Sequence, residues 1–119
     1  MSGCREQMLN PLLRRYDPIA KHGPGGHGTP MDLGIIEATE LLRAAIYDPT
    51  EAMQSTPSLW GYRNGRVYRF MCDNAQPASW HGYPADEKPP NAVLQQWRTE
   101  DVITNAEFNK LRRLPSRGH

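Results

Sequence analysis

Residues 59–72 decide the fold, and they read LWGYRNGRVYRFMC. The dipeptide Asn64-Gly65 stands between two runs rich in aromatic and β-branched residues. Asn-Gly in this setting is the strongest short-range signal for a β-hairpin, because both turn positions need positive φ. A two-residue turn pairs Arg63 with Arg66, and the pairing continues outward residue by residue. The sequence therefore predicts an antiparallel hairpin over residues 59–72.

Alternation of side chains gives the predicted hairpin two faces. One face carries Leu59, Tyr68, Phe70 and Cys72, and the other carries Trp60, Tyr62, Val67, Arg69 and Met71. We expect the first of these faces to be the core side of the sheet. Its expected partner is an amphipathic helix that precedes the hairpin.

That helix is predicted to run from about residue 30 to residue 47. Thr29 can cap it, Pro30 suits its first turn, and Asp32 stands three residues after the cap, as in a capping box. Apolar residues at helical spacing form one stripe: Ile35, Ala38, Leu41, Leu42, Ala45 and Ile46. Pro49 stops the helix. We expect the stripe to supply half of the core.

Downstream of the hairpin, the sequence predicts one more extended segment and two short helices. Residues 80–84, WHGYP, form either a third strand or an ordered loop. Helices are predicted over residues 91–98 and 104–114, the second with a capping box made by Thr104 and Glu107. Their inward residues are expected to be Val93, Leu94, Trp97, Phe108 and Leu111. The predicted fold class is therefore α+β, a small antiparallel sheet with helices on one side.

Length and composition favour one domain without a membrane anchor. The chain has 119 residues, too few for two independent cores, and its 10 glycines and 11 prolines predict long irregular stretches. No apolar run approaches the ~20 residues of a membrane span, and the N-terminus lacks the apolar core of a signal peptide. We treat residues 1–119 as one domain, to which residues 1–16 and 115–119 can be peripheral. A short helix over residues 5–14 would be interrupted by Pro11.

The net charge and the cysteine content limit which binding partners and which cellular compartment are expected for this protein. A net charge of +1 excludes strong non-specific attraction to nucleic acid or anionic lipid. Two cysteines do not make a disulfide scaffold, and no Cys-x-x-Cys pair exists for zinc or redox chemistry. We expect Cys4 to lie in a mobile terminus and Cys72 to be a small buried side chain. A reducing cytoplasm is the expected location, although a chain exported by a specialised apparatus would look the same.

Aromatic and basic residues gather between residues 60 and 83, and they suggest a surface for RNA. Aromatic planes stack on unpaired bases, and arginine pairs with phosphate. Cleavage of RNA by its 2′-hydroxyl needs a base, a cation on the phosphate and a donor to the leaving oxygen. We assign these roles to His81 as acid or base, to Arg66 or Arg69, and to Tyr83. The expected substrate contacts are Trp60, Tyr62, Arg63, Trp80 and His27, and the hypothesis requires no cofactor and no metal.

Structural explanations compete with these roles. Aromatic residues stabilise small sheets, and arginine covers exposed strand faces. Asp86 and Glu87 are either a carboxylate base near the WHGYP segment or solvated loop charges. The glycine-rich stretch with His22 and His27 can cradle a phosphate or be an irregular loop, and no third ligand is spaced to complete a metal site. The fold could also bring His27 to His81 as an acid/base pair.

Several stretches beyond residue 60 together make up one sequence pattern. They are residues 62–70 (YRNGRVYRF), 73–74 (DN), 80–84 (WHGYP), 90–94 (PNAVL) and 103–111 (ITNAEFNKL). Over about residues 60–114 the chain resembles C-terminal domains of bacterial polymorphic toxins, the variable tips of contact-dependent and rearrangement-hotspot proteins. Many such tips are similar to small α+β ribonucleases, so the resemblance implies a metal-independent ribonuclease and a cognate immunity protein as partner. It covers under half of the chain, which begins with its own Met and shows no delivery region.

A second hypothesis belongs to another class, a non-enzymatic binding protein of immunity or inhibitor type. It would use the acidic face of the predicted helix, with Glu37, Glu40 and Asp48, together with exposed aromatic residues. A structural domain without a site is the third possibility. Cleavage of RNA by the purified protein separates the first hypothesis from the other two.

Overall fold

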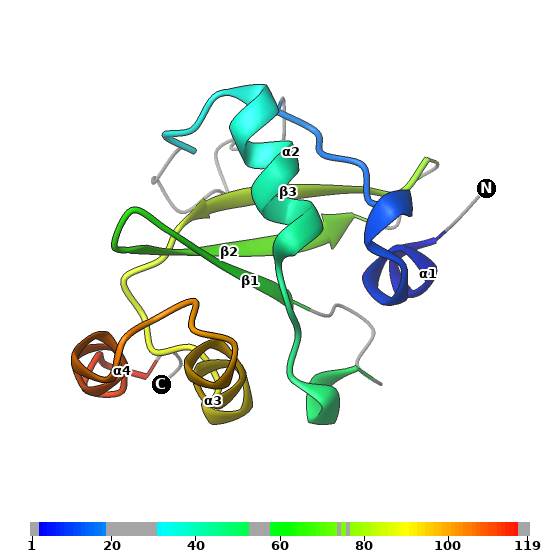
Figure 1. Cartoon of the computed structure of the whole chain (residues 1–119). Helices are drawn as coiled ribbons and strands as arrows, with labels where there is room; N and C mark the ends of the chain where they lie inside the picture. Colours follow the sequence, from blue (N-terminus) through cyan, green and yellow to red (C-terminus); the bar gives the residue numbers. More distant parts are fainter. Residues whose placement is uncertain (1–2, 19–30, 53–57, 74, 76, 117–119) are drawn as a thin grey trace.

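The structure is a computed structural model, which describes residues 3–18, 31–52, 58–73, 75 and 77–116. A three-stranded antiparallel sheet lies at its centre, and the strands follow one another in the order β1-β2-β3. The strands are β1 (Ser58–Arg63), β2 (Arg66–Asp73) and β3 (Ser79–Pro84), and the α-helices are α1 (Cys4–Leu9), α2 (Ile35–Ala44), α3 (Asn91–Thr99) and α4 (Asn105–Leu111). Two short 3₁₀ turns, η1 (Pro11–Leu13) and η2 (Pro49–Glu51), complete the described elements. Figure 1 shows α2 on one side of the sheet and α3 and α4 on the other. This confirms the predicted α+β class and corrects the expectation that the helices lie on one side, because each sheet face carries its own set of buried apolar residues.

The hairpin has the predicted register. Arg63 pairs with Arg66, and the turn residues Asn64 and Gly65 have φ of 51° and 78°. The WHGYP segment is a strand rather than a loop, since β3 pairs with β2 along its whole length. The sheet therefore extends the hairpin by one edge strand.

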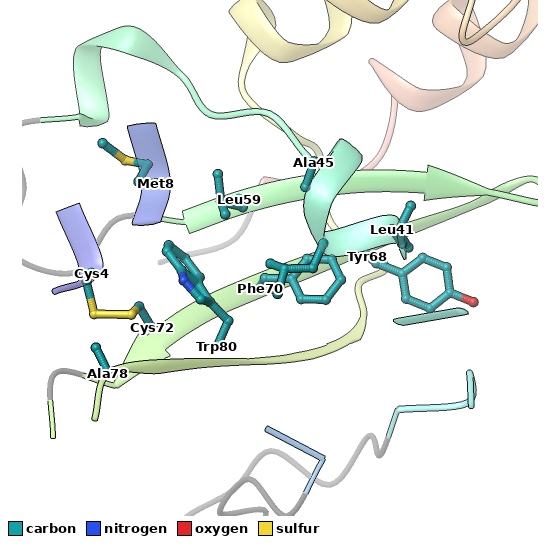
Figure 2. Packing of buried hydrophobic residues seen from close by; sticks show 11 residues of the cluster. Cys4, Met8, Leu41, Ala45, Leu59, Tyr68, Phe70, Cys72, Ala78 and Trp80 are labelled. Carbon is teal, nitrogen blue, oxygen red and sulfur yellow. A yellow bond between two sulfur atoms is a disulfide. The ribbon is translucent and has the colours of Figure 1, made fainter. Parts of the chain in front are cut away.

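Each face of the sheet is covered by its own hydrophobic cluster. The expected core face, with Leu59, Tyr68, Phe70 and Cys72, packs against α1 and α2. Figure 2 shows this cluster, in which Trp80 and Phe70 lie between the sheet and the two helices. On the other face, Trp60 and Val67 pack against α3 and α4 through Val93, Leu94, Trp97, Ile103 and Leu111. This second core covers only part of its face, and the rest of that face carries polar side chains.

Helix α2 is shorter than the predicted range at both ends. It begins at Ile35, where the Glu37 carboxylate accepts a hydrogen bond from the Gly34 N–H at 3.2 Å; the proposed cap Thr29 and Pro30 lie outside the described residues. Ile35 was expected in the core stripe but is 60% exposed. The helix ends at Ala44, because Ile46 exchanges two backbone hydrogen bonds with Trp60 of β1, which requires an extended chain.

The N-terminal segment is part of the core rather than peripheral to it. Cys4 forms a disulfide with Cys72 of β2, across a sequence separation of 68 residues. This corrects the expectation of a mobile Cys4 and an unpaired Cys72. Local spacing carries no signal for such a pair, which forms because α1 packs over the end of β2 and the two Cα atoms lie 5.9 Å apart. Met8 of α1 is fully buried in the same cluster.

The C-terminal helices lie close to the predicted ranges. Thr104 and Glu107 form the expected capping box, in which the Glu107 carboxylate accepts from the Thr104 N–H at 2.7 Å. The guanidinium of Arg98 lies 4.1 Å from the centre of the Phe108 ring, which is partly buried against the second core and therefore contacts a cation as well. Within the described part of the chain, every helix is too short or too polar to cross a bilayer.

Candidate functional site

The polar part of the second sheet face brings several predicted site residues together. Arg69 of β2 pairs with Tyr83 of β3, and Met71 pairs with His81. Residues directly opposite, or two apart along a strand, share one face of a sheet. Arg69, Met71, His81 and Tyr83 therefore point to the side of the sheet that also carries α3 and α4.

Three contacts fix the orientation of the Arg69 guanidinium. Its Nε donates to Ser58 Oγ at 2.9 Å, and its Nη1 donates to Glu87 Oε2 at 3.0 Å. Its Cζ lies 5.1 Å from the centre of the Trp60 ring, a cation–π arrangement. The ion pair is largely covered, with the two side chains only 19% and 14% exposed. Among the described residues, Nη2 has no hydrogen-bond acceptor, so it is a pre-oriented donor for a ligand.

A hollow of about 590 Å³ opens in front of this arginine. Its lining includes four charged side chains, one aromatic ring and one methionine: Glu51, Arg69, Glu87, Lys88, Trp60 and Met71. They come from η2, β1, β2 and the loop between β3 and α3. The hollow thus combines two cations, two carboxylates and one aromatic wall.

The charges in the hollow influence one another. Burial raises the pKa of the Glu51 carboxyl, repulsion from Asp48 raises it further, and attraction to Arg69 opposes both. Asp48 also positions Glu51, since its carboxylate accepts from the Thr50 N–H at 2.9 Å and starts the turn η2. Glu51 consequently holds its proton to higher pH than an ordinary glutamate.

The other two arginines of the hairpin lie on the opposite side of the sheet. Arg63 forms an ion pair with Glu37 of α2 at 3.3 Å. Arg66 pairs at 2.7 Å with Asp32, which precedes α2 and also accepts from the Tyr68 hydroxyl. The structure brings Arg69 to the face of His81, whereas Arg63 and Arg66 are engaged by α2 and its N-terminal approach.

Most of the predicted stacking surface is buried. Trp80 has no exposed surface, and its indole N–H donates to Gln7 Oε1 in the first core. Tyr62 lies beside the Trp97 ring and donates to Glu107 at 2.7 Å; burial, together with this bond, raises its pKa to about 12. Trp60 is 3% exposed and forms a wall of the hollow. Among the three, Trp60 is the aromatic residue that the hollow reaches.

Of the charged residues of the hollow, the sequence indicates no functional role for two and leaves the role of a third open. Glu51 and Lys88 fall in segments that the sequence predicts to be surface connections. Glu87 is predicted to be either a carboxylate base or a solvated loop charge. A usable signal was present for Lys88, since it precedes Pro89-Pro90, which fixes the chain just before a helix. No local signal marks Glu51, which reaches the hollow only through the tertiary fold.

The glycine-rich stretch with His22 and His27 lies outside the described residues, so its proposed phosphate or metal role and the pairing of His27 with His81 stay predictions. Among the described residues, no three His, Cys, Asp or Glu side chains are grouped as a metal site would require. Comparison of the chain with known protein families, with curated proteins and with solved structures gave no match.

Proposed function

We propose that this protein is a bacterial toxin-like ribonuclease that cleaves RNA at the hollow beside Arg69, without a metal ion. One observation carries the proposal: a guanidinium held in place by Ser58, Glu87 and Trp60 faces a hollow on the same side of the sheet as His81. Phosphoryl transfer depends on positioning and on charge stabilisation more than on covalent catalysis by the protein. Arg69 and Glu87 line the hollow, and His81, which is not among its lining residues, lies on the same side of the sheet; this arrangement supports both needs.

The chemistry follows from the neighbours of Arg69. Its Nη2, with Lys88 across the hollow, binds the non-bridging oxygens of the phosphodiester. Glu87, 3.0 Å from Nη1, accepts the proton of the 2′-hydroxyl as the 2′-oxygen forms its bond to phosphorus. The bond to the 5′-oxygen breaks, and His81 donates a proton to that oxygen, with Tyr83 as the alternative donor. The products are a 2′,3′-cyclic phosphate and a free 5′-hydroxyl.

The test compares cleavage of a labelled single-stranded RNA by the wild type and by four single variants. We expect His81→Ala, Arg69→Gln and Glu87→Gln each to lower the cleavage rate about 10²-fold or more. Arg66→Gln is the matched control, because Arg66 is bound to Asp32 on the other side of the sheet. Chelators should leave the rate unchanged, and melting curves should show that each variant is folded. Intact RNA after incubation with the wild type would overturn the proposal.

The binding hypothesis has less support from the acidic residues proposed for it. Glu37 caps α2 and pairs with Arg63, and Asp48 caps η2, so both carboxylates are engaged inside the molecule. Glu37 and Glu40 are both exposed, and Glu40 is the member of the set for which the described residues show no such contact. A cognate immunity protein therefore enters our proposal as an inhibitor of the enzyme, to be tested by loss of cleavage in a purified complex.

The compartment is part of the same proposal. Disulfides persist mainly in oxidising compartments, so the Cys4–Cys72 bond weighs against the cytoplasmic location predicted from the sequence. We propose that the chain matures where disulfides form and acts after export. Labelling of the cellular protein with a thiol reagent, before and after reduction, tests this directly.

A further inference from the structure

A second hollow adjoins the one beside Arg69. It measures about 490 Å³ and lies against α3 and α4, where it is lined by Lys88, Asn91, Gln95, Phe108, Arg112 and Arg113. Lys88 and Asn91 line both hollows. The two are therefore neighbours along one surface, with Lys88 at their common boundary.

The second hollow is positively charged. Its lining includes three cations and no carboxylate. In the described part of the chain, Arg63, Arg66 and Arg69 each pair with a carboxylate, whereas no such ion pair involves Lys88, Arg112 or Arg113. Although the whole chain has a net charge of only +1, three cations without an ion pair among the described residues line this one hollow.

The acidic residues of α3 and α4 are directed to other partners. The Glu107 carboxylate accepts from the Tyr62 hydroxyl and from its own capping box. Glu100 accepts from Gln96 at 3.2 Å. Arg98, which donates to Gln95 and covers Phe108, adds a further cation at the rim. The local field therefore favours an anionic ligand.

We infer that the second hollow binds the phosphate backbone of an RNA strand beside the linkage that is cleaved, so that the substrate is an extended single strand rather than a dinucleotide. This inference rests on the proposed ribonuclease activity. A strand with one phosphate at Arg69 would pass Lys88 and place its next phosphates at Arg112 and Arg113. Asn91 and Gln95 offer amide donors and acceptors to its bases and riboses.

A polyanion with evenly repeated charge fits this arrangement better than an acidic peptide does. The cations lie in two consecutive hollows that share a wall, not in one compact cluster. Each phosphate bound by a cation releases counterions, and for a single strand log K falls with log[salt] by about 0.7 per phosphate. The number of phosphates held is therefore measurable.

The experiment measures binding of a non-cleavable 2′-O-methyl oligonucleotide of about ten nucleotides to the wild type and to the double variant Arg112→Gln/Arg113→Gln, over a range of salt concentrations. We expect the variant to lose about 1.4 from the salt slope, two phosphates at about 0.7 each. Cleavage of long RNA should show a higher KM in the variant, and cleavage of a dinucleotide should be unchanged. The control is Arg43→Gln, an exposed arginine of the last turn of α2 on the other side of the sheet.

The outcomes separate this inference from the proposed function. Cleavage by the wild type with an unchanged salt slope in the double variant would overturn the inference and leave the ribonuclease standing. A reduced slope in a protein that cleaves no RNA would overturn the ribonuclease and support the binding site. Equal affinity for polyglutamate would assign the hollow to an acidic protein and overturn the inference, and the exposure of both arginines makes misfolding of the variant easy to check by melting curves.

Discussion

Arg14 shows how a single charged residue can hold a fold without acting at a site. Its guanidinium is buried and, among the described residues, forms no ion pair with a carboxylate. It donates to the carbonyl oxygens of Gln7, Met8, Leu42 and Ala45 at 2.6–3.0 Å. These carbonyls lie at the C-terminal ends of α1 and α2, where helices leave oxygens unpaired. Burial lowers the pKa of Arg14 to about 10, so it is still charged at neutral pH. One side chain thereby joins two helix ends.

Arg14→Met should destabilise the protein strongly. Leu42 O keeps its hydrogen bond from the Ala45 N–H, whereas the other three buried carbonyls would lose their donor. At about 1–3 kcal/mol for each unsatisfied group, the free energy of unfolding should fall by about 3 kcal/mol or more. Denaturant unfolding measures this change. Arg15→Met, an exposed neighbour, is the control and should stay within about 0.5 kcal/mol of the wild type. Equal stability of the two variants would contradict this account of Arg14.

Two glycines of the sheet leave space that neighbouring side chains fill, and one of them, Gly61, lies under helix α2. A Cβ on Gly61 would lie 2.8 Å from the Leu41 side chain of α2. A Cβ on Gly82 would lie 2.5 Å from the Phe70 ring and 2.9 Å from Met31 Cε. All three distances are shorter than van der Waals contact, so Gly61 sets the spacing between α2 and the sheet, and Gly82 makes room for the Phe70 ring and Met31.

Gly82→Ala should therefore cost about 1–3 kcal/mol through overpacking. The rigid Phe70 ring cannot yield without disturbing the first core, in which it is fully buried. Gly3→Ala is the matched control, because an added Cβ there meets nothing within 4 Å. Thermal melts of the two variants provide the comparison, and a Gly82→Ala melt equal to that of Gly3→Ala would show that the layers are free to move apart.

Elements with local signals were predictable, and the site was predictable only in part. Asn64-Gly65 and the Thr104–Glu107 capping box act over a few residues, so the hairpin and α4 could be placed from the sequence. Arg69 was a candidate because it lies in the predicted hairpin, and strand alternation already separates it from Arg66. Which of the two faces stays open to a ligand depends on where the helices pack. Glu51 reaches the site from the turn η2, which is distant from Arg69 and Glu87 in the sequence. No local sequence pattern predicts that contact.

At the scale of the whole molecule, the Cys4–Cys72 disulfide closes a loop that contains α1, α2 and the hairpin. Both cysteines are buried in the first core beside Trp80 (Figure 2). A cross-link over a long loop stabilises a protein mainly by restricting its unfolded chain. The bond therefore ties the N-terminal segment to the sheet that carries the site.

Reduction, or the variant Cys4→Ser/Cys72→Ser, should lower the free energy of unfolding by about 4 kcal/mol. Because the bond lies in the first core and the hollow lies on the second face, the folded fraction should keep the catalytic rate of the wild type. Denaturant unfolding with and without a thiol reductant measures the first quantity, and cleavage assays below the melting temperature measure the second. Equal stability of the reduced and oxidised protein would contradict the role assigned to the bond.

The same disulfide changes the outcome of proteolysis. A single cut anywhere between positions 4 and 72 yields two pieces that stay covalently attached, each still carrying its share of the strands and helices. A nicked molecule would thus migrate as one species until a thiol separates its halves.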